Sequence, residues 1–326
     1  MNFIDCAEIL VTARGGPSRN VALIEAALDQ AFRLTTEAVD PLCFPAGMEN
    51  VPTIQVMRYG SSSGGWTVED SDLDVVVVIC THTDNEEKRS ALETAFLCLY
   101  FCYLHEVENV RDLQKLINEK GTVSYRFFLN NLEKSLKVDL SVELSSKHEH
   151  VPWKVQLTRS VEKLLRRCLI EDVACDIARI IITWAKKNGH CHNGNTTTNL
   201  HISGSQYRLR SIHWALLVAY ALSVLTDPRT DSLQLQVHKV LRFISKMSFR
   251  THLLIVNTSE NPEIVWKPRV EETRGGSERT QFWIMHCHYD DIIQQNMARK
   301  ANYVPDKRGA ECLQEAVLQA SQCIML

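Results

Sequence analysis

The chain has 326 residues, of which 45% are hydrophobic and 23% charged, with a net charge of −3. This is an ordinary globular composition, long enough for one large domain or two lobes, and it excludes a globally basic chain. Any nucleic-acid partner must therefore be met by a local patch. No apolar run approaches the roughly 20 residues of a membrane span, and the first residues lack the features of a signal peptide. The eleven cysteines show no regular pairing, so we expect reduced thiols in a cytoplasmic protein.

The first predicted element is a long helix over residues 20–43, where apolar side chains recur at helical spacing. Ser18 is a candidate N-cap directly before it. Residues 45–51 predict a turn, and residues 53–59 predict the first strand. This strand leads straight into the most informative part of the chain.

Residues 60–79 read GSSSGGWTVEDSDLDVVVVI, a small-residue loop, two carboxylates and an unbroken apolar run. Side chains alternate along a strand, so Asp72 and Asp74 point to the same side at the edge of a buried strand. Paired carboxylates bind hard Mg²⁺, with Mn²⁺ as an alternative, and a loop of backbone amides and hydroxyls binds phosphate. The pattern predicts a site for metal-assisted nucleotidyl transfer. The alternative is an ordinary turn with a solvated strand edge.

A third carboxylate fits the same site. Residues 85–106 predict a second helix, and residues 123–132 and 137–144 predict two antiparallel strands, the latter reading KVDLSVEL with strict alternation. If this strand lies next to that of Asp74, Asp139 joins the pair. Three carboxylates hold two divalent ions about 3.5–4 Å apart in such sites, and Asp139 could accept the proton of an attacking hydroxyl. Otherwise Asp139 is a polar residue on a half-exposed strand.

These residues resemble the polymerase-β-like nucleotidyltransferase superfamily, whose pattern is a helix-capping Gly-Ser, a DxD strand and a later single Asp. The matching positions are Gly60, Ser61, Asp72, Asp74 and Asp139. The resemblance implies that Gly60, Ser61 and Ser62 contact the triphosphate of a donor nucleotide. It also implies that Asp72 and Asp74 bind both metal ions and that Asp139 completes the metal site on the acceptor side.

After Pro152 the pattern becomes helical. Residues 157–168, 171–187, 211–225 and 232–246 carry helical spacing, whereas residues 189–211 and 258–276 read as loops. We therefore expect an α+β, bilobal fold with a mixed-sheet catalytic lobe over residues 1–152. A helical lobe would follow over residues 153–326, with the active site in the cleft between them.

Two stretches of the second lobe suggest a nucleotide site. Residues 184–189 end one helix, and residues 212–220 resemble the paired helix of oligoadenylate synthetases, cyclic GMP-AMP synthase-like receptors and terminal uridylyl- and adenylyltransferases. In those families an aromatic side chain at the position of Trp214 stacks on a nucleobase, a contact that tolerates any base. The alternative for Trp214 is a core aromatic. Lys186 is a further candidate contact to the nucleotide.

One position departs from the related enzymes, which commonly carry a phosphate-binding lysine two residues before the tryptophan of this helix. Here that position is Ile182. Arg179 lies one turn earlier on the same face and could take over the phosphate contact, since i and i−3 are neighbours on a helix. The departure leaves open a catalytically inactive, duplex-RNA-binding protein with the same fold.

The long first helix, the third strand with its following Ser-Ser-Lys and the chain's C-terminal residues favour the branch of 2′-5′ oligoadenylate synthetases and cyclic dinucleotide synthases. That branch implies a second messenger made from ATP, with or without GTP, under the control of double-stranded RNA or DNA. The spacing GSxxxGxxxxxSDxD instead fits the terminal RNA uridylyl- and adenylyltransferases without a gap. Both interpretations remain open at this point.

Two further features concern partners. Arg159, Lys163, Arg166 and Arg167 fall at helical spacing and predict a basic face that could bind duplex nucleic acid, or a plain solvated face. The chain ends Cys-Ile-Met-Leu, a pattern for prenylation of Cys323, which some oligoadenylate synthetases share. One lipid would give only weak membrane association.

Overall fold

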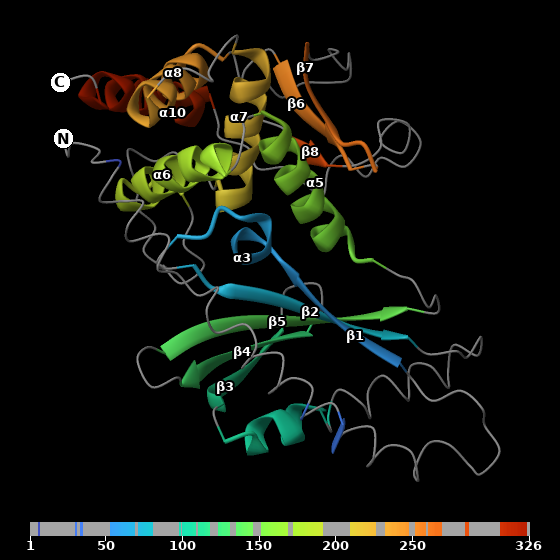
Figure 1. Ribbon diagram of the computed structural model, residues 1–326. Helices are drawn as coiled ribbons and strands as arrows, with labels where there is room; N and C mark the ends of the chain where they lie inside the picture. The colour runs from blue at the N-terminus through green and yellow to red at the C-terminus, as the bar shows by residue number, and fades with distance from the viewer. Residues whose placement is uncertain are drawn as a thin grey trace. The chain divides into compact units, whose positions relative to one another are not determined.

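The computed structural model of the chain is shown in Figure 1. It describes residues 53–68, 71–80, 100–108, 110–117, 123–130, 135–145, 151–168, 172–191, 209–225, 232–247, 252–258, 260–268, 284–286 and 307–324, with single positions at 6, 30, 33, 34 and 98. Apart from positions 30, 33 and 34, the predicted helix over residues 20–43 lies outside the described residues, as do residues 85–97 of the predicted helix over residues 85–106.

The chain divides into two compact units, which we describe separately. The sheet unit contains residues 15–63 and 69–156, and the helical unit contains residues 157–326 together with Met1–Arg14 and Gly64–Val68. The division expected after residue 152 is close to this change at Leu157. The segment Gly64–Val68 differs from the expectation, because its side chains, led by the fully buried Trp66, pack into the core of the helical unit.

The sheet unit is built on a five-stranded mixed sheet in the order β1-β2-β5-β4-β3 (Figure 1). Its strands are β1 (Thr53–Tyr59), β2 (Leu73–Cys80), β3 (Val110–Ile117), β4 (Val123–Asn130) and β5 (Ser135–Ser145). The short helix α3 (Ser61–Gly64) follows β1. β2 pairs with β1 in an antiparallel and with β5 in a parallel manner, and β4 and β5 form the expected antiparallel pair.

The apolar run of β2 is explained by burial on both faces. Alternate residues, from Leu73 to Ile79, pack with Tyr100 and Leu104 on one face of the sheet. The intervening residues pack with Val155 on the other face. A central strand that is covered on both sides needs apolar side chains at every position, so it loses the usual alternation. The polar residues of β2 are therefore confined to its start.

Strand β3 was not predicted, because its sequence, VRDLQKLI, lacks clear alternation. The register of β3 with β4 shifts between Arg111 and Gln114, and Asp112 has a φ of 52°. A β-bulge of this kind inserts an unpaired residue and breaks the period of two. Aspartate tolerates the left-handed conformation better than most residues do.

The helical unit contains α5 (Trp153–Cys168), α6 (Val173–Lys187), α7 (Ser211–Val224), α8 (Leu233–Ser245) and α10 (Lys307–Ile324). The four helices predicted between residues 157 and 246 are thus confirmed. α7 is apolar on all sides and occupies the centre of the core, as expected of a helix that is surrounded by other elements. The α10 helix packs against α8, where the His238 ring bonds to the Ser321 carbonyl at 2.6 Å.

The helical unit also contains a second sheet, which corrects the expectation of a purely helical lobe. Its strands are β6 (His252–Asn257), β7 (Glu263–Pro268) and β8 (Ile284–His286), in the order β7-β6-β8. β7 lies inside the range predicted to be a loop because prolines 262 and 268 read as breakers. Proline is tolerated at the ends of strands and on edge strands, and β7 is one of the two edge strands of this sheet.

The described cysteines, at positions 6, 80, 98, 102, 168, 175 and 191, are free thiols. Burial raises the pKa of Cys168 and of Cys175 to about 11, so both thiols are neutral at pH 7. Among the described helices, none combines the length and hydropathy that crossing a membrane requires.

Candidate active site

The predicted carboxylates gather on one face of the five-stranded sheet. Asp74 on β2 and Asp139 on β5 are direct partners across the parallel pair. Partners in register point to the same side. Asp72 directly precedes β2, and its bond to Lys137 of β5 brings its carboxylate to this face. The prediction that the strand of Asp139 lies next to the DxD strand is confirmed. The adjacency is set by backbone pairing in the centre of the sheet.

The Gly-Ser turn borders this face because Gly60 directly follows β1, whose last residue, Tyr59, is the partner of Asp74. Gly60 has a φ of +72°, and an added Cβ would stand 2.3 Å from Asp74 Oδ2. The missing side chain therefore lets the Asp74 carboxylate approach the backbone of the turn. Ser61 and Ser62 follow in α3, where the Ser62 hydroxyl bonds to the Tyr59 carbonyl at 3.4 Å.

Replacing Gly60 by alanine is expected to reduce both stability and activity. The left-handed backbone costs roughly 1–2 kcal/mol for a residue with a Cβ, and displacing the Asp74 carboxylate should lower kcat/KM by about 10²-fold. Gly65→Ala is the matched control, since Gly65 has a φ of +82° but would meet only the Cys175 side chain. Thermal unfolding and nucleotide-transfer rates are the measurements. Equal activity losses in the two variants would contradict the role of Gly60.

Two of the carboxylates, Asp139 and Asp72, form ion pairs with Arg126 and Lys137. Arg126 on β4 is the register partner of Asp139 and forms a fork with it, with Nε to Oδ1 at 2.8 Å and Nη2 to Oδ2 at 3.1 Å. Lys137 Nζ lies 2.6 Å from Asp72 Oδ2 and 3.9 Å from Asp139 Oδ2. The hydrogen bond to Asp139 is the main reason why the pKa of Arg126 is raised.

The chemistry of these donors fits a divalent ion such as Mg²⁺, because carboxylate oxygens are its preferred protein ligands. The space left at Gly60 brings Asp74 Oδ2 to the turn where a phosphate-bearing ligand would meet the backbone. In the described part of the chain, however, no three acidic, histidine or cysteine side chains converge into a metal-binding group. Asp72, Asp74 and Asp139 share a face, but Lys137 and Arg126 occupy oxygens that a metal ion would need.

Tyr59 adds a half-buried phenol to the same face. Its pKa is raised above the ordinary value, first by burial and then by the charge of Asp74, while a hydrogen bond with the Ser141 side chain works in the opposite direction. Lys154 Nζ lies 5.2 Å from the centre of the Tyr59 ring. The phenol therefore stays protonated and can serve only as a neutral hydrogen-bonding group beside the carboxylates.

Sequence reasoning did not assign a role to Arg126, Lys137, Tyr59 or Ser141. The alternation along β5 could have predicted that Lys137 and Ser141 share a face with Asp139. Lys137 lies two residues before Asp139 and Ser141 lies two residues after it. Arg126 had no such signal, since its place opposite Asp139 follows from the register of β4 with β5. A register between strands depends on the whole sheet and not on local pattern.

The remaining nucleotide-binding predictions fall in the helical unit, and Trp214 requires a correction. Its side chain is 0% exposed, its Nε1 donates to the His190 carbonyl at 3.1 Å, and its ring meets that of Trp184 edge to face at 5.8 Å. A ring enclosed in this way has no face for a nucleobase. The alternative of a core aromatic is what the structure shows.

Arg179 and Lys186 both lie on α6. The Arg179 guanidinium donates to the carboxylate of Asp176 one turn earlier, and its Nε is buried without a hydrogen-bond partner among the described residues. This pairing neutralises the charge that the prediction assigned to a triphosphate. Ile182 is fully buried in the core, where a lysine would have to bury its ammonium group. Lys186 is half-buried near the end of the helix.

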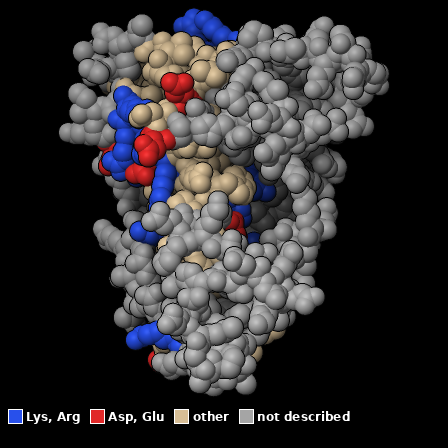
Figure 2. Space-filling view, turned by 90° about the vertical axis from the view of Figure 1, so that its right-hand side faces the viewer, with Lys and Arg blue, Asp and Glu red and all other residues tan. Residues whose placement is uncertain are grey.

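The predicted basic face on α5 is exposed, as expected, but most of its charges have partners in this chain. Lys163 donates to the Glu260 carbonyl and Arg167 to the Pro262 carbonyl, each at 3.2 Å. Arg166 pairs with Glu162 at 3.0 Å. Figure 2 shows basic and acidic side chains interleaved beside an uncharged surface. With Arg159, these residues make a mixed face rather than a purely basic one.

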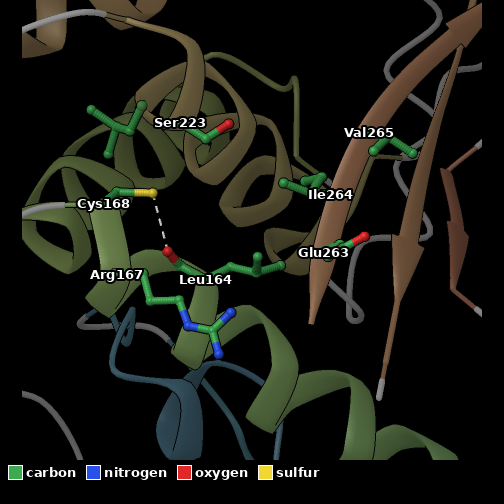
Figure 3. A pocket seen from close by; sticks show the side chains of 8 residues that line it. Leu164, Arg167, Cys168, Ser223, Glu263, Ile264 and Val265 are labelled. Atoms are coloured by element: carbon green, nitrogen blue, oxygen red, sulfur yellow. Dashed lines mark hydrogen bonds between the residues drawn. The ribbon is translucent and has the colours of Figure 1, made fainter. Parts of the chain in front are cut away.

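A hollow of about 450 Å³ lies elsewhere in the helical unit (Figure 3). It is lined by Leu164, Arg167 and Cys168 of α5, Leu222 and Ser223 of α7, and Glu263, Ile264 and Val265 of β7. The Cys168 thiol donates to the Leu164 carbonyl at 3.1 Å. Because its pKa is raised by burial, this thiol is not a nucleophile. The hollow contains none of the predicted catalytic carboxylates.

No protein-family model and no curated protein matches this chain. Solved structures do match. A cytoplasmic RNA terminal U-transferase superposes with a TM-score of 0.56 at 15% identity, over 97% of this chain and 91% of that chain. The Cid1 poly(U) polymerase with MgGTP bound gives 0.56 at 12% identity, over 97% and 92%. The structure of the GLD-2/RNP-8 complex gives 0.54 at 12%, over 98% and 97%.

The chain shares its fold with these nucleotidyltransferase structures, and the expected α+β class is confirmed. This fold is the one that the superfamily resemblance implied, whereas the roles of Gly60, Ser61 and the three aspartates stay predictions. The comparisons do not confirm the oligoadenylate-synthetase and cyclic-synthase branch. The prenylation of Cys323 stays a prediction, since this residue lies in the last turn of α10 and its side chain is outside the described part.

Proposed function

We propose that this chain is a metal-dependent nucleotidyltransferase that adds ribonucleotides to the 3′ end of an RNA. The observation that carries the proposal is the placement of Asp74 opposite Asp139 on adjacent strands, beside the Gly60 turn. The fold neighbours described above include a terminal U-transferase and a poly(U) polymerase, which supports an RNA end as acceptor.

In this proposal Asp72, Asp74 and Asp139 would hold the divalent ion, Mg²⁺ or Mn²⁺. The ion, when bound, supplies positive charge that stabilises the transferring phosphoryl group. Asp139 lies on the strand next to Asp74 and would accept the proton of the attacking 3′ hydroxyl. The turn at Gly60, Ser61 and Ser62 would present its backbone to the triphosphate of ATP, GTP or another nucleotide.

The proposal includes a cytoplasmic location, with weak membrane association through a prenylated Cys323. It also includes a contact between RNA and the α5 face, made by Arg159, Lys163, Arg166 and Arg167. Arg159 and Lys163 are exposed and lie one turn apart on α5, which is the spacing that lets two cations meet neighbouring phosphates. Lysine and arginine contacts of this kind are insensitive to RNA sequence.

The deciding experiment offers the purified chain single-stranded RNA with a free 3′ hydroxyl and each nucleoside triphosphate in turn, with Mg²⁺ or Mn²⁺. A matched RNA that ends in a 3′-deoxynucleotide is the control for the acceptor group. Stepwise lengthening of the first RNA and not the second is the expected result. Comparing the rates of lengthening would also rank the four nucleoside triphosphates as substrates.

A parallel reaction omits the acceptor RNA and adds long duplex RNA or DNA with ATP and GTP. Duplex-dependent products with 2′-5′ linkages would replace the proposal by second-messenger synthesis. Retention of duplex RNA on a gel without any product would replace it by the inactive binding protein.

A further inference from the structure

The carboxylate face carries its own positive charges in fixed places. Lys137 is 9% exposed, and its ammonium group lies 2.6 Å from Asp72 and 3.9 Å from Asp139. The Arg126 guanidinium takes both oxygens of Asp139. We call Lys137 and Arg126 the counter-cation pair. It neutralises Asp139, which the register places next to Asp74, and Asp72, which directly precedes β2.

Strand pairing fixes the backbone positions from which the side chains of Arg126, Lys137 and Asp139 extend. Arg126 faces Asp139 across the antiparallel pair of β4 and β5, and Lys137 precedes Asp139 by two residues on the same face. The backbones of Arg126, Lys137 and Asp139 cannot move apart without breaking the pairing of β4 with β5. The cations can leave the carboxylates only by rotation of their own side chains. The long, flexible stems of lysine and arginine allow such rotation.

The counter-cation pair competes directly with a divalent ion. A metal ion that binds Asp72 and Asp139 needs the oxygens that are now hydrogen-bonded, and its charge is repelled by an ammonium and a guanidinium within a few ångströms. Conversely, without either cation the carboxylates would face one another at close range on adjacent strands. Like charges at cross-strand positions destabilise a sheet.

We propose that Lys137 and Arg126 hold the carboxylates in the absence of metal and must swing away before a divalent ion binds, so that they set the metal affinity of the site. This inference rests on the proposed function, because it takes the three aspartates to be metal ligands. It adds that the ion binds only in exchange for these internal cations.

The test uses the full chain and Mn²⁺ alone, followed by electron paramagnetic resonance as the ion is titrated. Lys137→Met and Arg126→Met remove one charge each and keep most of the side-chain volume. Lys115→Met, on an exposed position of β3, is the matched control for charge loss. We expect each of the first two variants to bind Mn²⁺ at least about tenfold more tightly than the original chain, because an adjacent charge shifts carboxylate equilibria by that much or more. Lys115→Met should not change the affinity.

Thermal unfolding gives a second readout. In EDTA, the Lys137→Met and Arg126→Met variants should unfold at a lower temperature than the original chain, and excess Mn²⁺ should restore the loss, since a ligand that binds only the native state stabilises it. The original chain and Lys115→Met should respond less. If Mn²⁺ affinity is unchanged and the lost stability is not restored, the pair is purely structural and the inference is overturned.

Neither readout depends on turnover. A chain that never extends RNA but shows the expected gain in Mn²⁺ affinity would overturn the proposed function and leave the counter-cation pair in place. A chain that extends RNA while its variants bind Mn²⁺ no better than the original would overturn this inference alone.

Discussion

Asp74→Asn is expected to lower the rate of nucleotide transfer by more than about 10³-fold while the chain stays folded. The substitution keeps the shape of the side chain and removes the charge that faces Gly60 and the partner strand. Losing a charged group at the centre of such a site removes both a metal ligand and stabilisation of the transition state. RNA extension under single-turnover conditions is the measurement, with far-UV circular dichroism to check folding.

Asp112→Asn is the matched control, because Asp112 is an exposed carboxylate on the same sheet and asparagine tolerates its left-handed backbone. Its rate should equal that of the original chain. Asp139→Asn should behave as Asp74→Asn does. If Asp74→Asn retained its activity, the carboxylate face would not be the catalytic site, whatever reaction the chain carries out.

Trp214→Ala is expected to destabilise the helical unit by about 3–5 kcal/mol, which is the usual cost of truncating a buried aromatic side chain. The indole is completely enclosed and also bonds to the His190 carbonyl. Its loss leaves a cavity in the centre of the core and removes the hydrogen bond to the His190 carbonyl. Urea unfolding followed by circular dichroism measures the change in the free energy of unfolding.

Trp153→Ala serves as the control, since Trp153 is 54% exposed at the start of α5. A surface substitution of this kind changes stability by no more than roughly 0.5 kcal/mol. The experiment also separates the two interpretations of Trp214. A base-stacking residue would raise the KM for the nucleotide and leave stability intact, and that outcome would contradict the core assignment.

The carboxylates that share a face of the sheet could be predicted because their signal is local. The spacing of Asp72 and Asp74 before a buried run, and the alternation around Asp139, each need only the geometry of a single strand. The core role of Trp214 could not be predicted in this way. An aromatic side chain on a helix looks the same in sequence whether it stacks on a base or fills a core, and only the helices around α7 distinguish the two.

Local patterns in the sequence were enough to predict three carboxylates with a Gly-Ser turn and the helical character of most of the second unit. They did not predict that Asp139 pairs with Asp74, that Arg126 faces Asp139, or that Lys137 contacts Asp72 from 65 positions away in sequence. Strand and helix periods arise from bonds between near neighbours, whereas the partners of a charged side chain are set by long-range pairing of strands that the sheet as a whole must satisfy.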